Sequence, residues 1–233
     1  MKVSTLSVVI LAFSIVISGY FIGNTIHKAN NNNREVNVKG LAIRHVDADI
    51  AIWPMEIKRS GNDLAKLYEG VQEHKDAVKA FFLNMGFDDT EVNVGATNVI
   101  DRQMREYSTN YVGSRYILAA ELTIRTSNIS LIQKAQTDLI DLIGEGILVT
   151  SKNEWRPIEY RFTGLNDIKP EMIEESTINA KEAASKFVES STSRLGSIKS
   201  ANQGLFSISD LDSNTPDKKV VRVVSSVSFY LKN

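Results

Sequence analysis

The stretch YILAAELTI at residues 116–124 decides the fold class, because hydrophobic side chains recur at every second position of it. A period of two places such side chains together on one face of a β-strand. The same spacing recurs in several other segments, and we expect half-buried strands there as well. These segments are 36–38, 50–52, 92–96, 158–162 and 221–231.

Two helices are expected between these strands. Residues 64–85 carry apolar side chains at helical spacing and end at Gly86, a residue that suits the left-handed position after a helix. A second helix is predicted to begin with Ser130 and Gln133 in capping-box spacing and to end at Gly144.

A third helix is predicted to begin at Pro170, because proline favours the first helical position. The small residues Ala180 and Ala184 would let this helix lie close against a sheet. There are too few helices to connect every pair of strands by a crossover. We therefore expect an α+β fold, with a mixed, partly antiparallel sheet and about three helices packed on it.

The N-terminal segment carries no charged side chain from Val3 to Ile26. A membrane-spanning helix needs roughly 20 predominantly apolar residues. We therefore expect a signal anchor within residues 1–28 that contacts the membrane through residues 3–26, then a polar linker at 29–34 and a folded domain at 35–233. The alternatives are a signal peptide cleaved near Ser18 or Gly19, and a buried soluble helix.

The anchor predicts an inner-membrane protein whose domain lies on the extracytoplasmic, periplasmic side, or a periplasmic protein if the segment is cleaved. The chain has 233 residues, a formal net charge of −1 and no run of Lys or Arg, so nucleic acid is not an expected partner. It contains no cysteine, which excludes disulfides, thiol nucleophiles and thiolate metal ligands.

The sequence lacks a Gly-x-Ser-x-Gly elbow, a phosphate-binding P-loop and a His-Glu-x-x-His helix. His27, His45 and His74 have no partners at metal-ligand spacing. We assign no catalytic, cofactor-binding or metal-binding residue, and expect no cofactor. Asp47 and Asp49 share one face of a strand, where a structural role is favoured over acid–base chemistry.

Two further motifs favour structural interpretations. Gly144-Glu145-Gly146 follows a helix rather than a strand, so it is interpreted as a helix terminator and not as a dinucleotide loop. Trp53-Pro54 and Trp155-Arg156-Pro157 place proline in strand-like segments, which is typical of edge strands. An edge strand can pair with a second subunit, so a homo-oligomer is expected.

Several segments together resemble one protein family. They are Val36-Asn37-Val38-Lys39-Gly40, Asp49-Ile50-Ala51-Ile52-Trp53, Phe162-Thr163-Gly164-Leu165-Asn166-Asp167, Leu195-Gly196-Ser197-Ile198 and Val223-Val224-Ser225-Ser226-Val227-Ser228-Phe229. The chain resembles the SIMPL domain family of bacterial periplasmic immunogenic and oxidative-stress defence proteins. It departs from the family pattern at Ala42, where a second Gly is common, and at Ala48, where Pro is usual.

The resemblance implies an α+β domain of the cell envelope that tends to form oligomers and has a loose link to oxidative stress. It supplies no catalytic residues. The leading hypothesis is therefore a membrane-anchored, non-enzymatic scaffold or interaction module that self-associates and acts indirectly in envelope or oxidative stress defence. One alternative is a hydrolase or small-molecule-binding protein that uses a strand-end carboxylate. Another is an accessory component of an envelope transport or secretion complex with an unknown protein partner.

Overall fold

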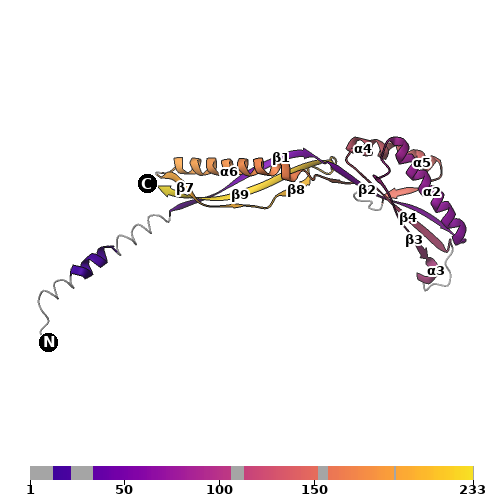
Figure 1. The fold of residues 1–233 in the computed structure, drawn as a ribbon, viewed down its shortest axis with the longest axis horizontal. Helices are drawn as coiled ribbons and strands as arrows, with labels where there is room; N and C mark the ends of the chain where they lie inside the picture. Colours follow the sequence, from indigo (N-terminus) through magenta and orange to yellow (C-terminus); the bar gives the residue numbers. More distant parts are fainter. Residues whose placement is uncertain (1–12, 22–33, 106–112, 152–156, 192, 233) are drawn as a thin grey trace, which may run out of the picture. The chain divides into compact units, whose positions relative to one another are not determined.

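The computed structural model describes residues 13–21, 34–105, 113–151, 157–191 and 193–232, and Figure 1 shows the path of the chain. Residues 13–21 are helical. The elements that follow are β1 (Glu35–Asp47), β2 (Ile50–Gly61), α2 (Leu64–Met85), β3 (Val92–Asp101), α3 (Arg102–Arg105), β4 (Tyr116–Thr126), α4 (Ile129–Asp138), α5 (Ile140–Gly144), β5 (Val149–Ser151), β6 (Glu159–Arg161), α6 (Leu165–Glu189), β7 (Arg194–Gln203), β8 (Ser207–Asp210) and β9 (Lys218–Lys232).

The chain divides into two structural units. Unit 1 comprises residues 1–44, 168–207 and 221–233, and unit 2 comprises residues 45–167 and 208–220. The predicted α+β class with antiparallel pairing is confirmed. The prediction of a single sheet is wrong, because the strands form two sheets. The alternation of hydrophobic and polar residues indicates which side chains are buried, but it does not indicate which strands pair.

Unit 2 is built on a five-stranded sheet in the order β3-β4-β2-β5, with β6 also paired to β2. The hydrophobic face of this sheet packs against α2, α4 and α5. Phe82 of α2 lies at the centre, with its ring centroid 6.0 Å from that of Trp53 and 5.4 Å from that of Phe87, both in edge-to-face geometry. This aromatic cluster fixes the helix on the sheet.

The predicted end of the first helix is confirmed, because Gly86 adopts the left-handed conformation with φ of 104°. The predicted start of the second helix is wrong. Asn128 caps it instead, accepting a hydrogen bond from the Leu131 amide at 3.1 Å, while the Ser130 hydroxyl donates to the same Asn128 oxygen. The helix also breaks at Leu139, which separates α4 from α5.

The third helix begins at Leu165, so Pro170 lies inside α6 and not at its first position. The carboxylate of Asp49 accepts hydrogen bonds from the backbone amides of Thr163 and Gly164, and so fixes the chain that leads directly into the helix. An acceptor distant in sequence thus satisfies the two amides that directly precede the first residue of the helix.

Pro54 does not mark an edge strand, as the sequence predicted, because β2 has partners on both sides. On one side β2 pairs with β4 throughout, and on the other it pairs with β6 at Ile50–Ile52 and with β5 at Met55–Ile57. On the second side no strand pairs with Pro54, so the backbone N–H that proline lacks interrupts no ladder of hydrogen bonds there. Trp155 and Arg156 lie outside the described residues.

Unit 1 is built on the sheet β1-β9-β7, with β8 paired to β9. Its core is small and joins one face of this sheet to α6 through the side chains Val36, Ala180, Ala184, Val227 and Phe229. The predicted close approach of α6 is confirmed at Gly40, where an added Cβ would lie 1.8 Å from the Ser176 carbonyl oxygen. Glycine is required there because the helix backbone occupies the space of a side chain.

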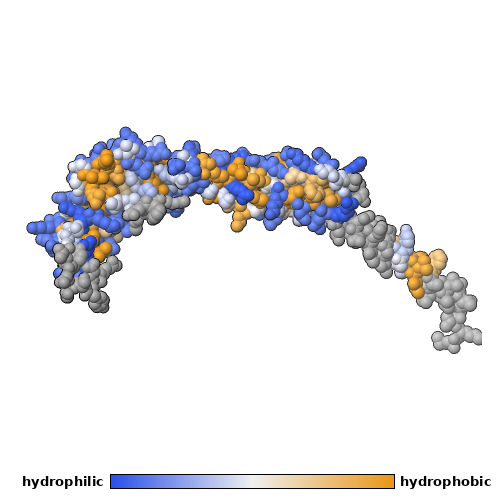
Figure 2. All heavy atoms as spheres, turned by 180° about the vertical axis from the view of Figure 1, so that it is seen from behind, coloured by the Kyte–Doolittle hydropathy of each residue, from blue (hydrophilic) through white to orange (hydrophobic). Residues whose placement is uncertain are grey.

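The N-terminal anchor predicted at residues 3–26 falls largely outside the described residues. Within the part of the chain that the structure describes, no helix has the length and hydrophobicity needed to cross a membrane. Large hydrophobic side chains of residues 13–21 are exposed, and Figure 2 shows hydrophobic patches on the surface.

Candidate functional site

Asp47 and Asp49, the two carboxylates considered for acid–base chemistry, both make structural contacts. Asp49 accepts hydrogen bonds from the Thr163 amide at 2.8 Å, the Thr163 hydroxyl at 3.0 Å and the Gly164 amide at 3.0 Å. Asp47 lies in a surface ion pair with Lys218 at 2.6 Å. Neither residue lines the cavities of unit 2.

The histidines are dispersed. His27 lies outside the described residues, His45 is exposed on β1, and His74 is half-buried on α2. Burial lowers the pKa of His74, and the positive charge of Arg59 lowers it further. No three His, Asp or Glu side chains come together as a metal site in the described segments.

Unit 2 contains a cavity of about 590 Å³, a size that suits a small organic ligand. Three elements distant in sequence line it. The first is α4, through Gln133 and Gln136, and the second is the chain that enters and forms β6, from Pro157 to Tyr160. The third runs from the last residue of β8 through the β8–β9 connection to the start of β9, and it contributes mainly polar residues: Asp210, Ser213, Asn214, Pro216, Asp217 and Lys219.

The β8–β9 connection is an ordered turn, held by Asp212. Its carboxylate accepts hydrogen bonds from the Asn214 amide at 2.7 Å, the Thr215 amide at 2.8 Å and the Thr215 hydroxyl at 2.8 Å. The hydroxyl bond is the main cause of the lowered pKa of Asp212, and the two amides lower it further. This turn fixes the positions of Ser213, Asn214 and Asp217 at the cavity.

Tyr160 and Lys219 form the buried wall of the cavity, with exposed fractions of 8% and 6%. Lys219 forms an ion pair with Asp210, which compensates both charges. Tyr160, Asp210 and Lys219 also line a second cavity of about 270 Å³, so the two cavities share this wall.

The Tyr160 hydroxyl makes no hydrogen bond with any residue that the structure describes. Burial raises the pKa of Tyr160, and the negative charge of Asp217 raises it further. Asp217 itself forms no ion pair among the described residues, and its closest side-chain partner is the Gln133 amide nitrogen at 3.5 Å. The cavity thus contains the Asp217 carboxylate within electrostatic range of the Tyr160 phenol and of the Lys218 ammonium.

Sequence reasoning missed this cavity. It identified Tyr160 only as a buried strand residue and did not consider Asp217. The one local signal was the Asp212 and Thr215 pair, which is typical of a side-chain-capped turn. The approach of α4, β6 and the β8–β9 turn is a tertiary effect, so no spacing in the sequence predicts it.

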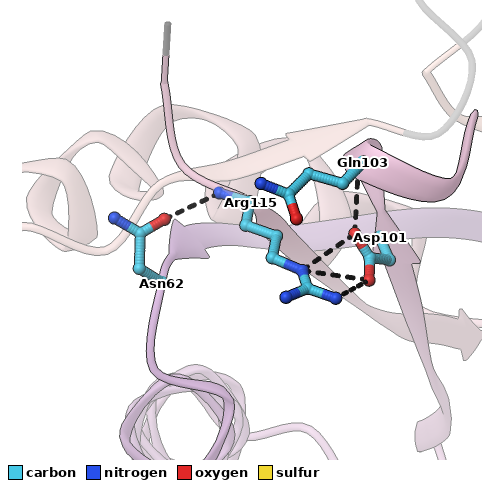
Figure 3. Close-up of polar contacts among 4 residues, drawn as sticks. All are labelled: Asn62, Asp101, Gln103 and Arg115. Carbon is cyan, nitrogen blue, oxygen red and sulfur yellow. Dashed lines mark hydrogen bonds and ion pairs between the residues drawn. The ribbon is translucent and has the colours of Figure 1, made fainter. Parts of the chain in front are cut away.

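A second polar cluster closes the hairpin of β3 and β4 (Figure 3). The Arg115 guanidinium donates to both carboxylate oxygens of Asp101, the shortest distance being 2.8 Å, and the Arg115 amide donates to the Asn62 side-chain oxygen at 2.8 Å. The Gln103 amide donates to Asp101 at 3.0 Å. The hydrogen bond from Arg115 is the main cause of the lowered pKa of Asp101. This cluster holds two chain segments together and lines neither cavity.

Comparison with known proteins confirms the family resemblance. No curated protein matches the sequence. The model of one family, described as "SIMPL: Protein of unknown function (DUF541)", matches residues 36–227. Because this match covers well over half of the chain, the protein belongs to the SIMPL family.

Proposed function

We propose that this SIMPL-family protein is a membrane-tethered, non-enzymatic module that self-associates through one face of the unit 1 sheet. The observation that carries this proposal is the open sheet face, meaning the face of β1 and β9 that points away from α6. It exposes adjacent hydrophobic side chains at Leu41 and Ile43.

The register of β1 and β9 shows which residues share the open sheet face. The Leu231 amide donates to the Arg34 carbonyl oxygen at 2.9 Å, and the strands run antiparallel from there. This register places Asn37 opposite Ser228, and the Ser228 hydroxyl indeed donates to the Asn37 side chain. It also places Leu41 opposite Val224.

The open sheet face therefore has a hydrophobic centre formed by Leu41, Ile43 and Val224. Leu41 is 40% exposed and Ile43 is 44% exposed. Near one end of the face, Lys199 pairs with Glu35 and lies 5.7 Å from the centre of the Tyr230 ring. A hydrophobic centre with a polar rim is the usual anatomy of a protein–protein interface.

Tethering is supported by residues 13–21, which are helical and expose several large hydrophobic side chains. A helix that is hydrophobic all round requires lipid or another apolar partner. With the uncharged run from Val3 to Ile26, this supports a membrane attachment and an extracytoplasmic location for the folded units.

A non-enzymatic role is supported by the structural contacts of Asp47 and Asp49. The absence of cysteine removes thiol-based peroxide chemistry, so a protective effect in oxidative stress would act through assembly or through binding of a second envelope protein.

The experiment is sedimentation velocity of the full-length protein in a non-ionic detergent over a concentration series. We expect the wild type to assemble, and Ile43→Lys to weaken assembly about tenfold or more, because a buried Ile contributes about 1.5–3 kcal/mol. Ile178→Lys is the matched control, since Ile178 is exposed on α6 of the same unit.

A wild type that stays monomeric at every concentration would contradict self-association. Weakening by Ile178→Lys but not by Ile43→Lys would place the contact on α6 instead. Co-purification of a second protein that Ile43→Lys releases from a monomeric chain would favour the alternative of an accessory role in an envelope complex.

A further inference from the structure

We propose that the end of unit 1 at which β1 begins docks on the headgroups of an anionic membrane. This surface, called the basic end below, is formed by Arg34, Lys186, Phe187, Arg194, Lys199 and Lys232. The inference rests on the proposed tether and adds a second, electrostatic contact with the same membrane. It does not involve the hydrophobic centre of the open sheet face.

Charge is divided unevenly between the two units. From residue 34 onward, unit 1 contains ten Lys and Arg residues and six Glu residues, whereas unit 2 contains 15 basic and 22 acidic residues. A chain with a net charge of −1 thus combines a basic unit with a strongly acidic one. Anionic headgroups attract the first unit and repel the second.

Strand pairing brings three of the cations to one end of unit 1. Arg194 lies opposite Lys232 in the ladder of β7 and β9. The Leu231 amide donates to the Arg34 carbonyl oxygen at 2.9 Å, and the Arg34 guanidinium donates to the Ser193 hydroxyl at 3.2 Å. The starts of β1 and β7 and the end of β9 therefore lie together, and each carries an exposed cation.

The last turn of α6 lies at the same end. Near the start of α6, Glu171 pairs with Arg44 of β1 at 2.6 Å, and further along the helix Ala184 packs in one core with Val36. α6 therefore runs antiparallel to β1, and its last turn lies beside the first residues of that strand (Figure 1). This turn adds the exposed side chain of Lys186.

Few acidic groups compensate the basic end. Lys199 pairs with Glu35, but Lys186, Arg194 and Lys232 form no ion pair with any residue that the structure describes. Each cation close to an anionic surface strengthens binding about fivefold. The three uncompensated cations therefore favour a surface with a high density of negative charge.

Phe187 gives the basic end a hydrophobic element. It is 62% exposed, directly follows Lys186 and precedes the exposed acid Glu189 by two residues. With Glu189 included, the basic end still has five cations and two acids. An exposed aromatic side chain beside cations is typical of segments that lie in the headgroup region of a bilayer.

The sequence also limits how far the basic end can lie from the tether. Ile26 is the last residue of the uncharged run, and β1 begins at Glu35, nine residue steps later. Nine steps span at most about 30 Å even when fully extended. A chain anchored through the uncharged run therefore holds the basic end close to the bilayer surface, which favours docking.

The test uses the full-length protein with an environment-sensitive fluorophore attached at Ser190→Cys, which provides a single thiol because the chain contains no cysteine. The protein is reconstituted in nanodiscs of phosphatidylcholine alone or with about 30% phosphatidylglycerol. We expect emission to be about twofold or more higher in the anionic nanodiscs. This difference should vanish at about 0.5 M NaCl, because salt screens the contact.

Lys186→Gln combined with Arg194→Gln should remove most of the lipid-dependent emission. Lys66→Gln combined with Lys134→Gln is the matched control, because both cations are exposed on helices of unit 2. Equal emission in the two lipids, or a difference that neither salt nor the first pair of substitutions reduces, overturns the docking while the tether stands. A chain that does not float with neutral phosphatidylcholine vesicles contradicts the tether, and the docking with it.

Discussion

Replacing Gly40 by alanine should separate α6 from the sheet of unit 1. The added Cβ would lie 1.8 Å from the Ser176 carbonyl oxygen and 2.4 Å from the Ala180 amide nitrogen. Both are backbone atoms, so no side-chain rotation relieves the overlap. To restore ordinary contact at about 3.4 Å, helix and strand must move apart by roughly 1.5 Å.

The loss of stability that this separation causes follows from the small core of unit 1. Overpacking typically destabilises by about 1–3 kcal/mol, and a clash with backbone on both sides lies at the upper end of that range. The movement would also loosen contacts of Ala180 and Ala184 with Val227 and Phe229. We therefore expect a loss of about 3 kcal/mol in unit 1, which is a large fraction of the stability of a small domain.

Hydrogen exchange measured by mass spectrometry separates this effect by unit. A loss of about 3 kcal/mol should accelerate exchange in β1 and α6 about 100-fold, while β2 and β4 of unit 2 stay protected. Gly144→Ala is the control, because an added Cβ there meets nothing within 4 Å. Unchanged exchange of α6 in Gly40→Ala would refute the direct contact of helix and strand.

Two further predictions concern the carboxylates. Asp49→Ala should lower the free energy of unfolding by about 2 kcal/mol in a urea titration, because it leaves the amides before α6 without an acceptor. Asp47→Ala should lower it by less than about 1 kcal/mol, because the ion pair of Asp47 is exposed. Equal losses in the two variants would contradict the role of Asp49 as an acceptor for these amides. The Asp101 pKa is lowered below its ordinary 3.8, so the ion pair with Arg115 contributes fully above that pH and is lost as the pH falls through the lower folded value. NMR amide exchange at Gln103 and Arg115 should accelerate in that acidic range, and Asp101→Asn should abolish the pH dependence; a step that persists in this variant would assign it to another group.

The strands with a buried face could be predicted from the sequence, and so could the end of α2. At β4 the alternating residues Leu118, Leu122 and Ile124 are fully buried, and Gly86 occupies the left-handed position. Both features are local, since each depends on residues within a few positions of one another.

Features that depend on contacts with segments distant in the sequence could not be predicted. β7 shows no hydrophobic alternation because nearly all of its residues are exposed, so periodicity does not report it. Pro54 indicated an edge strand, yet its position is tolerated by the gap between two short partners, β5 and β6. The pairing of Asp49 with the start of α6 spans more than 100 residues and has no local signature.

The candidate site was the least predictable part. Tyr160 and Asp217 are far apart in the chain and come together only when α4, β6 and the β8–β9 turn converge. An isolated aspartate in a polar turn looks like any solvated charge in sequence. Its approach to Gln133 and Tyr160 exists only in the folded state, because it is a property of three-dimensional packing.

The pairing of β1 with β9 sets an order of events during biosynthesis. β1 ends at Asp47 and β9 begins at Lys218, so β1 waits for a partner that is made about 170 residues later. At about 5–20 residues per second this delay is roughly 10–35 s. The hairpins and α2 of unit 2 are complete well before then, because β2, β3 and β4 are close in sequence. The sheet of unit 1 and the β8–β9 turn of unit 2 are therefore completed last, and β1 stays unpaired in the nascent chain until β9 emerges.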